Sequence, residues 1–412
     1  MNKAPFGFYF LLFTFHVHAT LATAQWPQFR GPSGQGHSSE QVVPVEWSET
    51  RNVVWKVPVA GRGWSSPVIS GDRVWLTTSV TQAGGASLRA MAYDVATGRE
   101  LLNVEIFRLS NANLKNPKNS HASPTPIAEG DRVYVHFGGE GTAALDAATG
   151  AILWAKKFPY ASQHGSGGSP VLHGDALIFS GDGHYEAWVI ALDARTGAVK
   201  WKTDRRKPFD QAYTTPLVIN VDGRDQVVSV GAYRTVAYDP ATGREIWTVR
   251  YEDGFSNVPR PVFAHGLVYI VTGFFQPAIL AVRPDGTGDV TATHIAWSMT
   301  RGAPLTPSPI VVGDELYAIS DLGVLSCVDA KTGRQHWQQR VGGNHSASPI
   351  FAGGRIYFLS EEGVATVITP GRTFQKVAVN ELGGATLASM AVGHQSLFIR
   401  SLTHLYRIGG RW

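Results

Sequence analysis

A short two-part pattern recurs along almost the whole chain at intervals of about 46 residues. The first part is an Asp-x-x-Thr-Gly turn followed four residues later by a large apolar residue, as in Asp193, Gly197 and Trp201. The second part is a small residue plus proline, then a β-branched run and a Gly-Asp turn. Its prolines are Pro67, Pro124, Pro170, Pro216, Pro261, Pro309 and Pro349, and Ser389-Met390 is an eighth equivalent without proline. This period is typical of four-stranded propeller blades and not of helical solenoids.

The first part of the repeat has a clear mechanical reason. The Asp carboxylate accepts N–H groups of the turn, and Gly adopts the positive φ that other residues avoid. We expect the Trp to lie on the outermost strand and to wedge between neighbouring blades, where burial of so large a ring is worth a few kcal/mol. The predicted structural repeat residues are Asp94, Gly98, Asp146, Gly150, Trp154, Asp193, Gly197, Trp201, Asp239, Gly243, Trp247, Trp297, Asp329, Gly333, Trp337 and Trp55.

Two copies depart from the pattern. In the fifth, the turn is displaced to Arg283-Pro284-Asp285 and Trp297 lies further on. In the seventh, Thr369-Pro370-Gly371 replaces the turn, and we expect Phe374 to take the place of the Trp.

The two ends of the repeat array are complementary. Residues 389–408 supply the inner strands of a last blade but lack its Trp strand, and residues 52–57 supply such a strand around Trp55. Pairing of these segments would leave no exposed sheet edge. The sequence therefore predicts an all-β fold over residues 51–412: an eight-bladed β-propeller of four-stranded antiparallel blades, closed by an N-terminal strand. A seven-bladed ring is the alternative, and we expect a monomer.

The first 24 residues have the features of a signal peptide. Lys3 precedes the apolar run from Phe6 to Phe15, and Ala22-Thr23-Ala24 forms a cleavage site after Ala24. A retained membrane anchor is the alternative. No later run is long enough for a transmembrane helix, so we expect a periplasmic or secreted chain with residues 25–50 as an N-terminal capping segment.

Composition excludes several classes of function. A net charge of +4 over 412 residues gives no case for nucleic acid as a partner. Cys327 is the single cysteine, so a disulfide framework and a Cys-rich metal site are excluded. Its side chain is most simply a buried thiol. The sequence also contains no P-loop, His-Glu-x-x-His or Gly-x-Ser-x-Gly motif.

The repeats resemble the tryptophan-docking repeats of the pyrroloquinoline quinone (PQQ) propeller superfamily, over residues ~50–408. The start at Gln25-Trp26-Pro27-Gln28-Phe29-Arg30-Gly31-Pro32 resembles that of a group of exported bacterial PQQ-like repeat proteins. The superfamily includes quinoprotein alcohol dehydrogenases, which hold PQQ and calcium, and non-catalytic exported propellers similar to BamB, a component of the outer-membrane β-barrel assembly machinery. The chain lacks the adjacent cysteines of the dehydrogenases, and no motif matches their calcium-binding and catalytic-base residues. It also lacks the lipid-anchoring cysteine of BamB.

Candidate site residues fall where successive blades connect and where second and third strands turn. Those connections cross one face near the channel, so polar and aromatic groups from several blades would converge there. The ligand-binding candidates are Trp64, His121, His164, Asp182, His184, Asp210, Tyr213, Asn257, Arg260, Arg301 and His345. Two other interpretations remain: turn residues that satisfy buried backbone, and a metal site of His121, His164, His184 or His345 with Glu140 or Asp182.

These observations predict an exported, non-catalytic PQQ-like propeller that binds a protein, peptide or small ligand on its loop-rich channel face. No catalytic residue can be assigned, and no cofactor or metal is expected. The alternative is a PQQ- or metal-dependent oxidoreductase similar to quinoprotein dehydrogenases, which rests on the resemblance and on the polar funnel.

Overall fold

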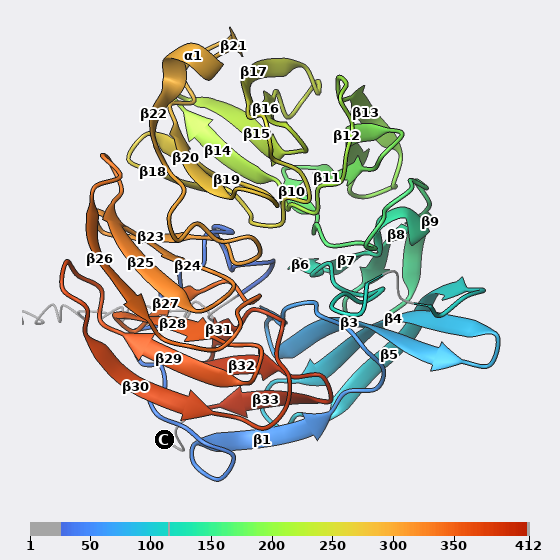
Figure 1. The fold of residues 1–412 in the computed structure, drawn as a ribbon. Helices are drawn as coiled ribbons and strands as arrows, with labels where there is room; N and C mark the ends of the chain where they lie inside the picture. Colours follow the sequence, from blue (N-terminus) through green and yellow to red (C-terminus); the bar gives the residue numbers. More distant parts are fainter. Residues whose placement is uncertain (1–25, 114–115, 410–412) are drawn as a thin grey trace, which may run out of the picture.

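The computed structural model describes residues 26–113 and 116–409, and it forms a ring of eight sheets around a central channel (Figure 1). Each blade has its innermost strand at the channel and its last strand at the rim. The first four blades are β2 (Val68–Ser70), β3 (Arg73–Gln82), β4 (Gly85–Asp94), β5 (Glu100–Leu109); β6 (Ile127–Glu129), β7 (Arg132–His136), β8 (Thr142–Asp146), β9 (Ile152–Lys156); β10 (Val171–His173), β11 (Ala176–Asp182), β12 (Ala187–Asp193), β13 (Val199–Asp204); and β14 (Leu217–Val221), β15 (Arg224–Val230), β16 (Arg234–Tyr238), β17 (Glu245–Arg250) with the short parallel β21 (Gly288–Asp289).

Three further blades and a composite one complete the ring. They are β18 (Val262–Ala264), β19 (Leu267–Thr272), β20 (Ala278–Val282), β22 (Ile295–Met299); β23 (Ile310–Val312), β24 (Glu315–Ile319), β25 (Val324–Asp329), β26 (Gln335–Arg340); β27 (Ile350–Ala352), β28 (Arg355–Leu359), β29 (Val364–Ile368), β30 (Lys376–Glu381); and β31 (Ala391–Gly393), β32 (Ser396–Arg400), β33 (His404–Ile408) with β1 (Val53–Pro58). The described helical segments are η1 (Gly138–Glu140) and α1 (Thr291–His294), and neither has the length or apolarity to cross a membrane.

The ring closes as the sequence predicted. Strand β1 lies antiparallel to β33, with Trp55 opposite Arg407, so the N-terminal strand completes the eighth blade. The predicted all-β eight-bladed fold is confirmed. The predicted signal peptide, residues 1–24, lies outside the described residues.

The tryptophans link neighbouring blades by one repeated hydrogen bond. The indole N–H donates to the backbone carbonyl that follows the turn Asp of the next blade: Trp55 to Val95 at 2.8 Å, Trp154 to Ala194 at 3.0 Å, Trp201 to Pro240 at 2.9 Å and Trp297 to Ala330 at 2.9 Å. The turn glycine is required by the same contact, because a Cβ on Gly197 would lie 2.7 Å from the Trp154 ring. Thus the two halves of the first repeat signature are the two sides of an interblade joint.

Trp247 meets a blade whose turn is altered, and its contact changes accordingly. Its indole N–H donates to Gln226 Oε1 at 2.8 Å, and Gln226 Nε2 donates to the Pro284 carbonyl at 3.2 Å. The Gln226 side chain therefore links Trp247 to the displaced turn of the next blade.

The prediction for Phe374 was wrong. Strand register places Ala378 opposite Val367, as it places Trp337 opposite Cys327 one blade earlier. The seventh turn closes from Thr369 N–H to Gln375 C=O and is one residue longer than the regular turn, so the four-residue spacing fails there. The ring of Phe374 instead packs edge-on against Trp337, with centroids 5.1 Å apart.

The capping segment replaces the aromatic residue that blade seven lacks. Trp47 is buried and stacks on Tyr357 of β28. Asn380 of β30 holds this segment on both sides, since its Oδ1 accepts the Trp47 N–H at 2.8 Å and its Nδ2 donates to the Val45 carbonyl at 2.9 Å.

Residues 26–37 form a plug inside the channel. Trp26 exchanges two backbone hydrogen bonds with Ile69 of β2, at 3.0 and 2.9 Å, and Phe351 of β27 donates to the Gly36 carbonyl at 2.8 Å. Arg260 is fully buried and donates through Nη1 to the Phe29 carbonyl at 2.7 Å. The plug thereby joins inner strands of blades far apart in the ring, and it closes the channel interior around Phe29.

Candidate functional site

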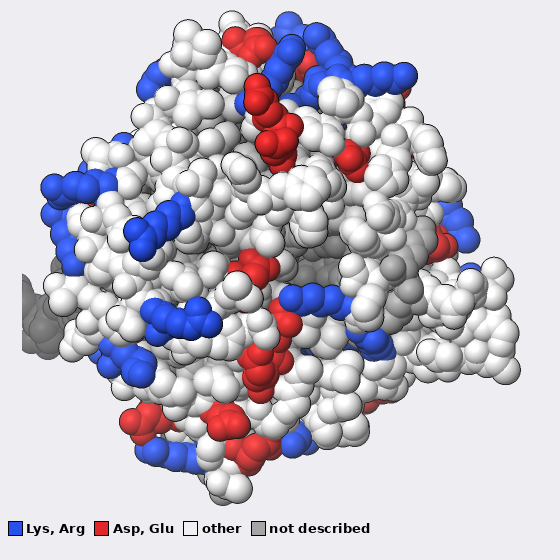
Figure 2. Space-filling view, in the orientation of Figure 1, with Lys and Arg blue, Asp and Glu red and all other residues white. Residues whose placement is uncertain are grey.

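A cavity of about 680 Å³ opens on the face that carries the connections between blades. Figure 2 looks onto this face, which is hollowed near its centre. Phe29 of the plug contributes to the lining, so the plug limits the depth of the cavity along the channel. The cavity lining comes from every blade.

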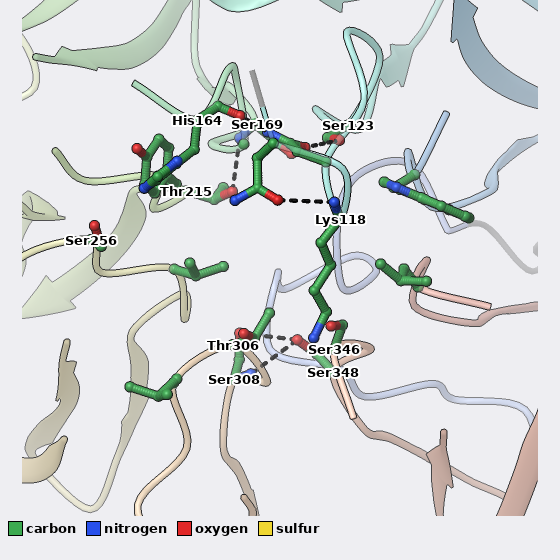
Figure 3. A pocket seen from close by; sticks show the side chains of 18 of the residues that line it. Lys118, Ser123, His164, Ser169, Thr215, Ser256, Thr306, Ser308, Ser346 and Ser348 are labelled. Carbon is green, nitrogen blue, oxygen red and sulfur yellow. Dashed lines mark hydrogen bonds between the residues drawn. The ribbon is translucent and has the colours of Figure 1, made fainter. Parts of the chain in front are cut away.

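Hydroxyl groups from seven blades, which we call the hydroxyl ring, line the cavity near the starts of the inner strands. Each backbone N–H donates to the side-chain oxygen of the next blade: Ser66 to Thr125 at 3.0 Å, Thr125 to Ser169 at 2.9 Å, Ser169 to Thr215 at 2.9 Å, Arg260 to Ser308 at 2.9 Å, Ser308 to Ser348 at 3.0 Å and Ser348 to Ser389 at 2.8 Å. Figure 3 shows the Ser169–Thr215 and Ser308–Ser348 pairs on two sides of the cavity. The Ser348 hydroxyl donates to Ser308 Oγ at 3.1 Å, whereas the hydroxyl hydrogens of Thr125, Ser169, Thr215 and Ser389 remain for other partners.

Aromatic and amide side chains form the walls. The aromatic lining residues besides Phe29 are Trp64, Tyr213, Phe255 and Phe274. Asn116, Asn119 and Gln163 add amide groups, and His164 adds an imidazole whose ring centroid lies 6.0 Å from that of Tyr213. The walls are thus neutral, with apolar faces interspersed with hydrogen-bonding groups.

The charged groups of the lining are already engaged. Among the described lining residues, Lys118 and Asp321 carry charge at neutral pH. The Lys118 side chain extends across the cavity toward Ser346, and its Nζ lies 2.6 Å from Glu361 Oε1 (Figure 3). Asp321 Oδ2 accepts the backbone N–H of Leu305 at 2.6 Å. The lysine is therefore not available to an anionic ligand without loss of its carboxylate partner, whereas the partners of Asp321 are neutral backbone N–H groups.

Three of the eleven predicted site residues line this cavity: Trp64, His164 and Tyr213. His121 lies at a neighbouring cavity of about 260 Å³, together with Glu140, and its Nε2 is 3.3 Å from the Ala112 carbonyl oxygen. His184 and Asp210 form a pair with Nδ1 and Oδ1 3.0 Å apart, outside the lining.

The other predicted residues have structural contacts instead. Asp182 is buried beside Arg205, with Oδ1 and Nε 2.7 Å apart. Asn257 is buried and donates to the Gly231 carbonyl, while Arg260 holds the plug. His345 is buried, with Nε2 3.0 Å from the Gly342 carbonyl oxygen, and burial lowers its pKa. Arg301 is exposed and does not line the cavity.

The residues proposed for a metal site are not brought together. In the described part of the chain, no group of three or more His, Cys, Asp or Glu side chains is arranged to hold a metal ion. The lining also does not fit PQQ, whose three carboxylates need several cationic partners. The single lysine of the lining is paired with Glu361.

Sequence reasoning missed the hydroxyl ring, Phe29, Lys118 and Phe274. A Ser or Thr precedes Pro67, Pro126, Pro170, Pro216, Pro309 and Pro349, and Arg260 takes that place before Pro261, but the position was interpreted only as the entry to a strand. These hydroxyl groups line the cavity because the propeller brings the starts of the inner strands together around the channel. Phe274 lies on the turn between β19 and β20 and Lys118 on the connection between β5 and β6, segments that the sequence placed on this face, but the sequence analysis did not select these two residues.

The family described as outer membrane protein assembly factor BamB matches residues 39–183 and 185–401. The chain belongs to this family. The match covers most of the propeller. It includes most of the strands whose tryptophans link neighbouring blades.

Individual relatives show the extent of the similarity. The outer membrane protein assembly factor BamB of Burkholderia pseudomallei (strain K96243) is 25% identical over 229 residues, which cover 54% of this chain and 56% of that protein. Quinohemoprotein alcohol dehydrogenase ADH-IIG of Pseudomonas putida is 30% identical over 151 residues, covering 33% of this chain and 20% of that protein. The matched regions thus span about half or less of these relatives.

Solved structures share the fold. The crystal structure of BamB from Moraxella catarrhalis superposes with a TM-score of 0.61 at 16% identity, covering 86% of this chain and 99% of that one. A europium-containing methanol dehydrogenase gives a TM-score of 0.68 at 11% identity, covering 92% and 90%. Because proteins of both kinds share the ring, the fold does not choose between binding and catalysis.

Proposed function

We propose that this chain is an exported, non-catalytic BamB-like propeller of the bacterial envelope that binds its ligand in the cavity on the connection face. The observation that carries the proposal is a concave site lined by loops of every blade, with neutral polar groups and aromatic faces converging on it. A location in the envelope is supported by the signal-like N-terminus and by the BamB family match.

A binding role accounts better for the lining than a redox role does. The charged lining residues are tied to other protein groups, and the described residues offer no three-ligand group for a metal. Four turns between second and third strands carry exposed apolar side chains, namely Tyr185, Phe275, Leu322 and Leu402.

Site-specific photocrosslinking tests this proposal. A benzophenone amino acid is placed at Phe274, which lines the cavity, and at Val199, an exposed residue on the outer strand β13, as the matched control. Irradiation of living cells should give an adduct at position 274 and none at position 199, detected by mass spectrometry. Adducts at both positions, or at neither, would contradict a specific site in the cavity. Fractionation of the same cells tests the envelope location.

A further inference from the structure

We infer that the ligand of this cavity is a neutral oligosaccharide. This inference rests on the proposed binding function and names its ligand class. The observations that carry it are a floor of hydroxyl groups, walls of aromatic faces and amides, and a single lysine that already has a carboxylate partner.

The state of the charges selects a neutral ligand. Recognition of phosphates and carboxylates depends on cationic donors that are free to form charge-assisted hydrogen bonds. Here Lys118 is held 2.6 Å from Glu361, and Glu361 also accepts the Ser346 hydroxyl at 2.5 Å. An anionic ligand would meet a lysine already neutralised by Glu361, and separation of this half-exposed pair would cost only a small amount of free energy.

The floor is suited to a ligand that carries many hydroxyl groups. Thr125, Ser169, Thr215 and Ser389 each accept a backbone N–H through their side-chain oxygen, so the hydrogen of each hydroxyl is directed to another acceptor. A sugar hydroxyl can accept that hydrogen and donate its own. These hydroxyl groups are uncharged donors that recur from blade to blade, and they can form hydrogen bonds with the hydroxyl groups around the edge of a sugar ring.

The walls provide the apolar half of sugar recognition. Phe255 and Phe274 contact each other with centroids 6.1 Å apart, and Trp64 and Tyr213 line the cavity from other blades. A pyranose ring has hydroxyl groups around its edge and C–H groups on its faces, and aromatic faces pack against such C–H groups. The volume of about 680 Å³ lies within the range of small-molecule sites, ~300–1,000 Å³, and admits a short oligosaccharide.

An extended peptide finds less to bind here. Peptides that join a sheet need unpaired backbone groups at a strand edge. At the channel, β2 already pairs with Trp26 and β27 with the segment around Gly36 and Ser38. Those inner edges are therefore used by the plug, and the cavity offers side chains in place of a strand edge.

Calorimetric titration of the purified chain tests the inference. The probes are cellotetraose, maltotetraose, chitotetraose and mannotetraose at millimolar concentration, with tetragalacturonate as the charged counterpart. We expect saturable binding of at least one neutral probe and none of tetragalacturonate. Phe274→Ala should weaken that binding about tenfold, which corresponds to about 1.4 kcal/mol.

Two variants separate recognition from stability. Val199→Ala removes an exposed apolar side chain from the outer strand β13, away from the cavity lining, and it should leave the affinity unchanged. Thr306→Val removes a lining hydroxyl at nearly constant shape and should weaken binding with no change in Tm. Failure of all four neutral probes to bind, or equal affinity of Phe274→Ala and the parent chain, overturns the saccharide inference. A crosslinked protein at position 274 together with that failure would retain the binding function and identify a protein ligand.

Discussion

The indole of Trp47 stacks on the ring of Tyr357, with centroids 6.3 Å apart and planes inclined by 22°. In the preceding blade, the equivalent Tyr317 packs against Trp337 of its own outer strand. In blade seven the outer-strand position is Ala378, so a residue more than 300 positions away in the chain fills the joint. The N-terminal segment is thus part of the ring, and not only a cover over it.

Trp47→Ala should therefore behave as a core substitution. Loss of a buried Trp costs about 3–5 kcal/mol, because the cavity left behind collapses only partly. Guanidinium unfolding, followed by intrinsic fluorescence and circular dichroism, measures the loss. Trp47→Phe is the matched control, since it keeps an aromatic ring against Tyr357, and it should retain most of the stability. Equal stability of Trp47→Ala and the parent chain would show that the segment does not contribute to the joint.

Arg260→Met should release the tip of the plug. The Arg260 side chain donates to the Phe29 and Pro216 carbonyls, and burial lowers its pKa to about 9, which leaves it charged at neutral pH. Without these bonds, residues 26–37 should be cleaved by protease faster than in the parent chain. Limited proteolysis with mass spectrometry measures the rate. Arg244→Met, at an exposed turn position, is the control and should leave the rate unchanged.

The buried pair of Asp182 and Arg205 should be costly to break from one side. Burial raises the pKa of the Asp182 carboxyl, and the Arg205 guanidinium beside it opposes that rise. Asp182→Leu leaves the arginine without its counter-ion and should cost about 3–5 kcal/mol. The double variant Asp182→Leu with Arg205→Met should recover much of this loss. If the double variant loses as much free energy of unfolding as Asp182→Leu and Arg205→Met lose together as single variants, the two residues act independently.

His136 should make the fold sensitive to acid. It is fully buried against Phe179, and burial lowers its pKa to about 3. The unfolded chain takes up a proton below pH ~6.5 and the folded chain does not, so stability is lost as pH falls from ~6.5 toward 3, by up to ~1.4 kcal/mol per pH unit.

Unfolding midpoints of the parent chain and His136→Gln at several pH values between 7 and 4 isolate this contribution. Other acid-sensitive groups act equally in both chains, and His345, whose pKa is also lowered by burial, is one of them. The variant should show a shallower decline. Parallel curves for the two chains would contradict the assignment to His136.

Local patterns were sufficient for the blades. The Asp193-x-x-Thr-Gly turn, its Trp201 and the proline that opens each inner strand act over a few residues, so the chain itself displays them. The closing strand was also predictable, because the end of the array lacked the strand that residues 52–57 supply. The same reasoning failed at Phe374, where one additional turn residue shifts the register and no local signal reports it.

The cavity was decided by the tertiary structure. The face could be inferred from blade topology, but His345, Asn257 and Arg260 were expected there and lie buried among backbone carbonyls. Whether a polar loop side chain satisfies backbone or faces a ligand depends on the packing of the neighbouring blade, which a repeat does not encode. In the same way, Phe29 becomes a wall of the cavity only because the capping segment enters the channel, a contact between residues far apart in sequence.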